Sequence, residues 1–166
     1  EEVEGMEEDV WGRVVTAPSA KTRRIVDALV GGDAVLFALT DIHVEDGSRE
    51  MTALRQYVAD RGFESAVTGG WREAMGEGGG KDGAGGVMLA WKRTEVRLEG
   101  KVEEVAEGRI LRAQMCLPRC GARVDAMAVY MPVREGAMGE AVREMWDAME
   151  GRAMGNRGLL IMGDMN

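Results

Sequence analysis

Long hydrophobic runs and cysteines are both scarce in this sequence. No apolar run approaches the about 18 residues that a membrane-spanning helix needs, which argues against a membrane-embedded protein. The two cysteines, Cys116 and Cys120, are too few for a disulfide scaffold and favour a reducing, intracellular compartment. With 166 residues, of which 45% are hydrophobic and 30% charged, the composition is that of one globular domain.

Histidine occurs once, at His43, and this removes several kinds of catalytic site. A Ser-His or Cys-His pair is not credible with one histidine, and His43 with two cysteines cannot supply the four ligands of a closed zinc site. The glycine-rich stretch before Lys81 is not a phosphate loop either. Met75 stands where the first glycine of G-x-x-x-x-G-K belongs, and Asp82 stands where serine or threonine belongs.

Positively charged residues are fewer than negatively charged ones. The chain has 21 Lys and Arg against 29 Asp and Glu, for a net charge of −8. This is the wrong sign for binding nucleic acid through bulk electrostatics, so contact with a phosphodiester would need a local basic patch or a metal ion. Six of the acids fall within residues 1–9, which we expect to be a solvated lead-in to a domain over residues 10–166.

The first part of the chain alternates strand and helix patterns. Ser19 and Ser48 are typical N-caps, and each precedes a segment that ends at glycine. Ala34 to Leu39 is a continuous apolar run of the kind found in a strand covered on both faces. The sequence therefore predicts strand, helix, strand, helix and strand over residues 10–15, 19–30, 34–39, 48–62 and 63–67.

A glycine-rich segment separates this part from the rest. Nine glycines lie in the eighteen residues from Gly69 to Gly86, and because glycine loses the most entropy on ordering, we expect a long mobile surface loop. Three strand patterns without intervening helices follow and suggest an antiparallel meander. The later elements are strands at 87–91, 110–117 and 122–131, a helix at about 137–150 and a last strand at 159–162. The fold class is α/β.

Two carboxylates stand at the ends of buried strands. Asp41 follows the run AVLFALT, and Asp164 follows LLIMG. If both strands belong to one sheet, the two acids lie side by side at its carboxyl edge, where ligands of α/β proteins usually bind. Two acids brought together repel each other unless a cation lies between them, and hard oxygen ligands suit Mg²⁺ or Mn²⁺. The alternative is that both are turn residues, since Asp is common at strand exits.

The segment LLIMGDMN, which ends at Asn166, resembles the hydrophobic-strand G-D-F-N motif of the endonuclease/exonuclease/phosphatase superfamily. AVLFALTDIHV resembles the family block D-I-L-C-L-Q-E-T-H, with Asp41 where the metal-binding glutamate is usual and His43 at the non-catalytic histidine. Three further blocks follow family order. They are the basic stretch Lys21 to Arg24, which resembles the LINE-type retrotransposon branch, Gly85 to Leu89 (family G-G-V-A-I-L) and Val129 to Pro132 (family V-Y-A-P).

The resemblance implies the N-terminal part of a four-layered α/β sandwich with mixed, largely antiparallel sheets. It also implies hydrolysis of a phosphodiester or phosphomonoester with Mg²⁺ or Mn²⁺, and nucleic acid, DNA rather than RNA, as the partner. In that scheme Asp41 holds the metal, Asp164 orients or deprotonates the attacking water, Asn166 fixes Asp164 and the phosphate, and Tyr130 hydrogen-bonds the scissile phosphate.

Three departures from the family pattern bear on activity. No asparagine lies near Gly12 to Val14, where the family's first strand ends in a catalytic Asn, and Asp41 is one methylene shorter than glutamate. The family's S-D-H block, with its phosphate-binding histidine, is absent from these residues. We therefore expect a partial domain with little turnover alone. It derives either from a metal-dependent nuclease of a mobile element, which would be nuclear, or from a non-catalytic relic. A fragment of an inositol or lipid phosphatase is the third alternative.

Overall fold

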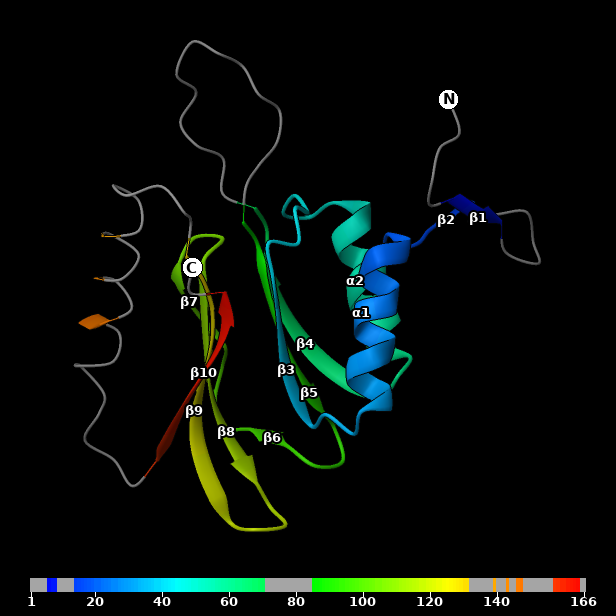
Figure 1. Ribbon diagram of the computed structural model, residues 1–166. Coiled ribbons are helices and arrows are strands. Elements are labelled where there is room, and N and C mark those ends of the chain that lie inside the picture. The colour runs from blue at the N-terminus through cyan, green and yellow to red at the C-terminus, as the bar shows by residue number, and fades with distance from the viewer. Residues whose placement is uncertain are drawn as a thin grey trace.

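The computed structural model describes residues 6–8, 14–70, 85–131, 139, 143, 146–147 and 157–164 (Figure 1). The helices are α1 (Ala20–Gly31) and α2 (Arg49–Ala59). The strands are β1 (Met6–Glu8), β2 (Val14–Thr16), β3 (Leu36–Thr40), β4 (Phe63–Thr68), β5 (Val87–Lys92), β6 (Arg97–Leu98), β7 (Glu103–Ala106), β8 (Ile110–Leu117), β9 (Ala122–Tyr130) and β10 (Gly158–Asp164).

Two sheets face each other, and the two helices cover the outer face of one of them (Figure 1). The three-stranded sheet has the order β3-β5-β4 and is antiparallel throughout. The five-stranded sheet has the order β10-β9-β8-β6, with β7 also paired to β8, and only β10 runs parallel to its neighbour. β1 and β2 form a separate antiparallel pair. The predicted α/β class with mixed, largely antiparallel sheets is confirmed.

The core has two layers that share β5. Between the sheets, Val87 and Leu89 of β5 pack with Leu111 and Met115 of β8. Between the three-stranded sheet and the helices, Met88 packs with side chains of α1, α2, β3 and β4. Successive side chains of a strand point to opposite faces, so a strand covered on both sides must be apolar throughout. This is why the run VMLAW of β5 is buried without a break.

Both helices begin at the predicted caps. The hydroxyl of Ser19 accepts a hydrogen bond from the Thr22 N–H (3.2 Å), and that of Ser48 accepts one from the Met51 N–H (3.1 Å). These bonds satisfy N–H groups that have no partner inside the helix. No helix in the described part of the chain is long and apolar enough to cross a membrane.

Two expectations about sheet membership are wrong. β5 does not form a meander with β8 and β9, because it pairs with β3 and β4 in the other sheet. β3 and β10 do not share a sheet either, so Asp41 and Asp164 do not lie at the edge of a single sheet. Three short strands, β1, β6 and β7, have no apolar run and are not foreseen from the sequence, and β1 falls within residues 1–9, the expected lead-in.

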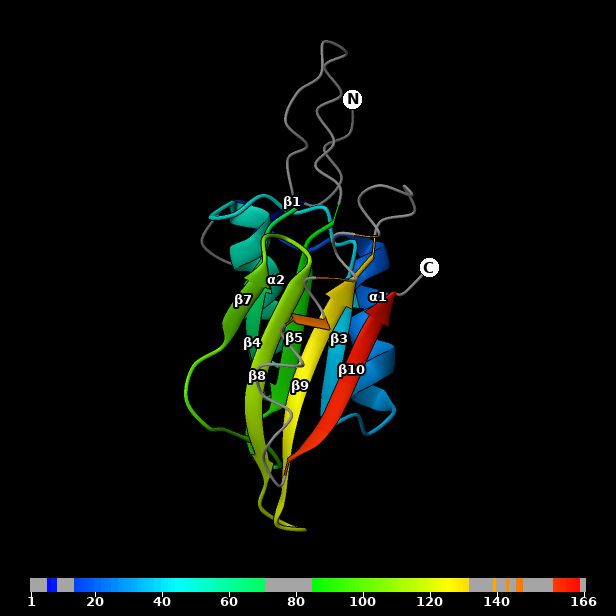
Figure 2. The same cartoon turned by 90° about the vertical axis from the view of Figure 1, so that its left-hand side faces the viewer.

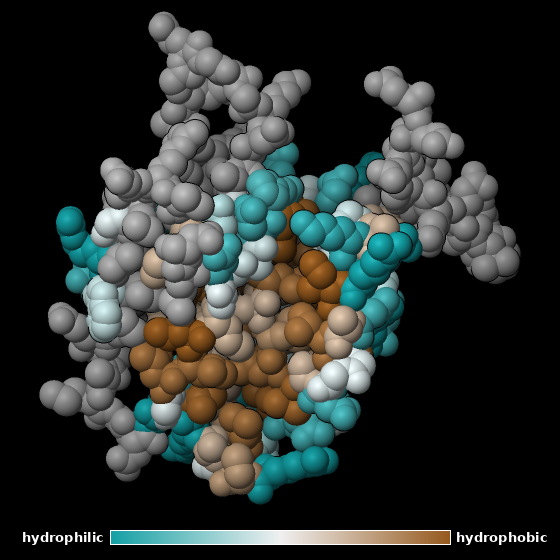
Figure 3. Space-filling model, viewed as in Figure 1, coloured by the Kyte–Doolittle hydropathy of each residue, from teal (hydrophilic) through white to brown (hydrophobic). Residues whose placement is uncertain are grey.

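β3 and β10 are edge strands of facing sheets, and they contact each other. Apolar side chains gather over this open side of the sandwich (Figure 3). Leu159 and Leu160, on the edge strand β10, are exposed, unlike the apolar residues of the inner strands. The open side therefore combines unpaired strand edges with apolar surface.

Some expectations fall on residues that the structure does not describe. The centre of the glycine-rich segment, residues 71–84, lies outside the described part, as does most of the helix expected at 137–150. Residues 139, 143, 146 and 147, which are described, are helical. Pro132 and Asn166 also lie outside the described residues.

Candidate active site

Three polar residues form a row across neighbouring strands of the five-stranded sheet. Asp164 of β10 is in register with Tyr130 of β9. The pairing of Ile110 with Val129 places Arg109 opposite Tyr130, whose N–H donates to the Arg109 carbonyl (2.8 Å). Tyr130 packs against the core between the sheets, and residues in register share a face. The row Arg109–Tyr130–Asp164 therefore faces the three-stranded sheet.

Asp41 meets this row from the opposite sheet. It follows β3, and its carboxylate accepts a hydrogen bond from the Tyr130 hydroxyl. Asp41 Oδ1 also accepts one from the Gly85 N–H (3.2 Å), and Nε2 of His43 lies 3.0 Å from the same oxygen. The strand ends of two facing sheets thus bring Asp41 and Asp164 to one tyrosine.

The electrostatics of the site centre on Tyr130. Burial raises its pKa above the ordinary value, and the negative charge of Asp41, the hydrogen bond to Asp41 and the charge of Asp164 raise it further. The nearby Arg109 acts in the opposite direction. Arg109 is only 6% exposed, so its positive charge lies inside the protein, near Tyr130. A phenol with a raised pKa stays protonated at neutral pH and can donate a hydrogen bond.

The backbone that carries Asp41 is strained. Asp41 and His43 have φ values of +55° and +49°, in a region that non-glycine residues adopt at a cost of about 1–3 kcal/mol each. The surrounding structure holds them there, because the N–H groups of Ile42 and His43 donate to the carbonyls of Gly86 and Gly85. Such strain is common at sites where a side chain must be aimed at a ligand.

Gly85 and Gly86 lie where other residues would not fit. Both have φ near +90°, and a Cβ on Gly85 would lie 3.1 Å from the Gly108 carbonyl oxygen and 3.4 Å from the Tyr130 ring. Two hydrogen bonds hold Gly108 in place. Its N–H donates to the Glu104 carboxylate (3.0 Å), and its carbonyl accepts a hydrogen bond from the Gly86 N–H (2.8 Å). The glycine pair thus lets three backbone segments meet beside Tyr130.

The donor set suits a hard divalent cation. No group of three or more His, Cys, Asp or Glu side chains that could hold a metal exists among the described residues. Mg²⁺ often needs fewer protein ligands, since it is commonly held by one or two carboxylates together with water and substrate phosphate. Asp41 and Asp164 converge on Tyr130 from two sides and fit that minimal set.

Arg109 is the residue that sequence reasoning missed. It stands between Gly108 and the apolar pair Ile110 and Leu111, in a position that looks like the end of a turn. The signal lies in the strand register, which puts Arg109 directly opposite Tyr130. Without knowing which strands pair, a single arginine before a strand carries no such information.

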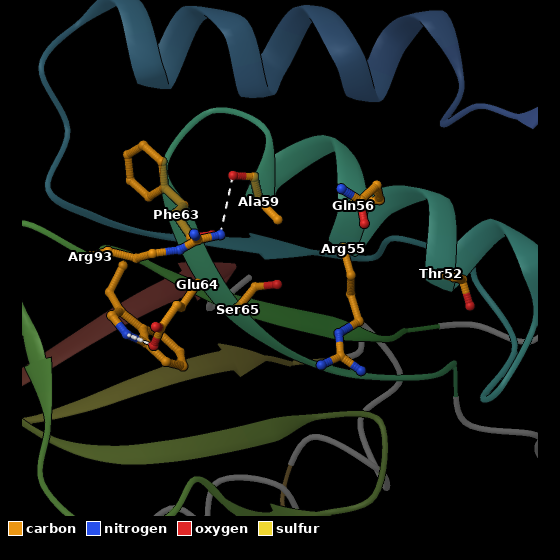
Figure 4. A pocket seen from close by; sticks show the side chains of 9 residues that line it. Thr52, Arg55, Gln56, Ala59, Phe63, Glu64, Ser65 and Arg93 are labelled. Atoms are coloured by element: carbon orange, nitrogen blue, oxygen red, sulfur yellow. Dashed lines mark hydrogen bonds between the residues drawn. The ribbon is translucent and has the colours of Figure 1, made fainter. Parts of the chain in front are cut away.

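Two hollows lie near the three-stranded sheet. A cavity of 430 Å³ adjoins Asp41 and lies between the start of α1 and residues 41–44, with Lys21 among its lining residues. A groove of 490 Å³ lies between α2 and β4. Arg55 and Ser65 line it, and Arg93 donates a hydrogen bond to the Ala59 carbonyl (Figure 4). This groove is at the end of β4 opposite to the candidate site, because Phe63 pairs with Lys92 and Thr68 with Val87. Only the first hollow belongs to the site.

Comparisons with known proteins give matches by structure alone. None of the family models and none of the curated proteins compared with this sequence matches it. Three solved structures illustrate the likeness. The human Nocturnin catalytic domain with bound sulfate has 11% identity and a TM-score of 0.56, over 90% of this chain and 58% of that one. ANGEL2, a 2',3'-cyclic phosphatase in complex with adenosine-2',3'-vanadate, has 13% identity and a TM-score of 0.64, over 89% and 44%.

An endonuclease/exonuclease/phosphatase family protein from Bacteroides thetaiotaomicron has 12% identity and a TM-score of 0.60, over 87% of this chain and 54% of that one. The chain thus spans about half the length of the solved proteins that it matches. At such identities the likeness concerns the fold. The chain has the fold of the endonuclease/exonuclease/phosphatase superfamily.

Proposed function

We propose that this chain supplies metal-binding and catalytic side chains to a divalent-metal-dependent phosphoesterase site that cleaves nucleic acid. The observation that carries the proposal is the convergence of Asp41 and Asp164, from two facing sheets, on the hydroxyl of Tyr130. Two like charges near one hydroxyl are costly in a half-buried place, and a cation between them removes that cost.

Each side chain has a role that its position allows. Asp41 would hold Mg²⁺ or Mn²⁺, which when bound neutralises the charge that builds on the phosphoryl oxygens. Asp164 would orient the attacking water and accept its proton. Tyr130, kept protonated by its surroundings, would donate its hydroxyl proton in a hydrogen bond to a phosphoryl oxygen. Asn166, two residues after Asp164, is proposed from the resemblance alone to fix that aspartate and the phosphate.

The substrate class rests on the sequence blocks and on the structural neighbours. Lys21, the first residue of the basic stretch, lines the cavity beside Asp41, and the blocks resemble the retrotransposon branch, whose partner would be DNA in the nucleus. D. rerio TDP2, a structural neighbour, was solved with a single-strand DNA product. A mannosyl-6-phosphatase is also among the neighbours, so a phosphatase acting on a small phosphoester is the second candidate.

Turnover by this chain alone is proposed to be low. Its one histidine, His43, contacts Asp41, so no histidine is left to bind the phosphate as in the superfamily. Groups in an active site act as a unit, and the loss of one removes most of the rate. A non-catalytic relic and a weak nuclease differ in whether any metal-dependent cleavage remains.

A binding experiment tests the site without requiring turnover. A dinucleotide with one phosphodiester should shift the NMR signals of the Tyr130 ring when Mg²⁺ is present and not in its absence. Asp41→Asn should abolish the Mg²⁺-dependent part, whereas Glu45→Gln, at an exposed position of the same loop, should leave it unchanged. A shift that is independent of Mg²⁺, or that persists in Asp41→Asn, would contradict the proposal.

Cleavage of supercoiled plasmid with Mg²⁺ or Mn²⁺ tests the turnover. We expect a signal near background for the chain and for Asp164→Ala alike. Robust nicking that disappears in Asp164→Ala would overturn the expectation of low turnover, and would show that these residues suffice for catalysis.

A further inference from the structure

A second row of charged residues crosses the five-stranded sheet at its other end, where β8 turns into β9 (Figure 2). Arg97 of β6 is in register with Cys116 of β8, and Cys116 with Arg123 of β9. Gly158 is in register with Val124, so Arg157 comes next to Arg123. The three arginines Arg97, Arg123 and Arg157 are here called the arginine row.

The arginine row has more positive charge than its partner can balance. All three guanidinium groups contact one carboxylate, Glu99, at 3.8 Å, 3.4 Å and 2.9 Å respectively. Guanidinium groups keep their charge at any physiological pH. Because these three groups meet at one carboxylate, salt screens their mutual repulsion only in part. Within the described part of the chain, one glutamate for three arginines leaves an excess that a second anion would neutralise.

The excess extends beyond the row. A second glutamate, Glu95, is shared by Lys92 (3.9 Å) and Arg119 (3.2 Å). Among the residues that the structure describes at this end of the sandwich, five cations therefore share two carboxylates, in a chain whose net charge is −8. The neighbouring Arg112 contacts two carboxylates, Asp125 at 2.7 Å and Glu103 at 3.5 Å, so this group offsets one charge of the excess and leaves the rest.

Two of the three arginines are accessible. The side chains of Arg97 and Arg123 are 69% and 59% exposed, so an anion can reach them, whereas that of Arg157 is 24% exposed. Neighbouring strands lie about 4.8 Å apart, so the backbone of the row spans about 15 Å over four strands, with Cys116 of β8 between Arg97 and Arg123. A hollow of 310 Å³ adjoins Glu99 and has Lys101 on its wall.

We propose that the arginine row binds the phosphodiester backbone of a nucleic acid. The guanidinium fork matches the geometry of two phosphate oxygens, and several cations gathered at one place suit a chain of closely spaced anions. This surface is the local basic patch that an acidic protein needs in order to meet a polyanion. The choice of nucleic acid over an acidic polypeptide rests on the proposed function, whereas binding itself requires no hydrolysis.

The row and the candidate active site lie at opposite ends of β9. Arg123 and Tyr130 are seven residues apart, or about 23 Å along the strand. The arginine row would therefore anchor the polymer at a distance from the carboxylates, and its contribution is independent of Asp41 and of any metal.

Fluorescence anisotropy with a labelled single-stranded DNA of 20 nucleotides and mixed sequence tests this surface. The measurement uses the full chain at low salt with EDTA, so that the metal site does not contribute. Arg97→Glu/Arg123→Glu should weaken binding at least tenfold, and the dependence of log Kd on log salt should fall by about 1–2 units, since about 0.7 is lost per phosphate contact.

A matched control separates the surface from the net charge. Arg49→Glu/Arg55→Glu makes the same change in charge at exposed positions of α2, and should weaken binding less than threefold. Both double variants are checked for folding by circular dichroism, and Arg97→Gln/Arg123→Gln replaces the first if it does not fold. Equal losses in the two variants, or no binding by the natural chain, would overturn the proposal.

Two further arms complete the test. Polyglutamate of equal charge should displace the DNA poorly, and displacement as strong as that by unlabelled DNA would reassign the surface to an acidic protein and overturn the proposal. The natural chain should bind the DNA in EDTA, where no metal contributes. Normal binding here together with failure of the Mg²⁺ experiment would refute the proposed function and leave the arginine row intact.

Discussion

Asp125→Ala should be among the most destabilising single substitutions in this chain, because it removes the nearer carboxylate partner of a buried guanidinium group. Arg112 is 3% exposed, and its Nη2 donates to Asp125 Oδ2 at 2.7 Å. Among the described residues, Glu103, at 3.5 Å, is the other carboxylate in contact with Arg112. Breaking a buried pair from one side costs about 3–5 kcal/mol, which is a large share of the about 5–15 kcal/mol that stabilises a typical domain.

The partial contact with Glu103 places the expected loss at the lower end of that range. Arg112→Met/Asp125→Ala should recover much of the loss, because it removes the uncompensated charge and leaves an apolar stem in its place. Urea unfolding followed by tryptophan fluorescence measures both, since Trp91 lies in the core between the sheets. A loss below 1 kcal/mol for Asp125→Ala, or a double variant less stable than Asp125→Ala, would refute the reasoning.

Three further predictions concern the site, the helices and the response to pH. Gly163→Ala should lower the thermal midpoint and weaken Mn²⁺ binding. The new Cβ would overlap the Val129 carbonyl and push β10, with Asp164, away from β9. An unchanged thermal midpoint would contradict this prediction. Ser48→Ala should cost about 1 kcal/mol in urea unfolding through loss of the α2 cap, and Thr52→Ala, whose hydroxyl makes only an exposed bond on the same helix, should cost less. Burial acts to raise the pKa of Asp27, but hydrogen bonds from Arg61 and Tyr57 outweigh it and hold the pKa below the ordinary value. The bonds to the Asp27 carboxylate therefore stabilise the fold above about pH 4, and they stabilise it less as the pH falls through the lowered pKa. Asp27→Asn should therefore make the thermal midpoint fall less steeply with acid. An equally steep fall in the variant would show that these bonds do not contribute to stability.

The local elements follow from the sequence because their signals are local. Ser19 and Ser48 begin the two helices as predicted, since a hydroxyl before an apolar periodic segment satisfies the free N–H groups wherever the helix packs. The strand patterns at 110–117 and 122–131 correspond to β8 and to β9, which ends one residue earlier. Two-residue β6 offers too little sequence for any pattern.

Sheet membership is what the sequence could not supply. β5 and β8 are both apolar runs, and only long-range packing decides that β5 joins β3 and β4 while β8 joins β9. The same limit applies to the candidate site, where Asp41 and Asp164 meet across two sheets. Arg109 and the arginine row depend on register, so neither could be recognised before the strands were paired.

The claim that Asp41 and Asp164 share a divalent ion beside Tyr130 can be measured directly with Mn²⁺, which broadens the NMR signals of nearby nuclei. The chain has two tyrosines, and Tyr57 lies on α2, across the three-stranded sheet from the site, where it donates to Asp27. Small amounts of Mn²⁺ should broaden the ring signals of Tyr130 and leave those of Tyr57 sharp, and Asp41→Asn/Asp164→Asn should abolish the difference. Equal broadening of both tyrosines, or broadening of Tyr130 that survives in the double variant, would contradict the account.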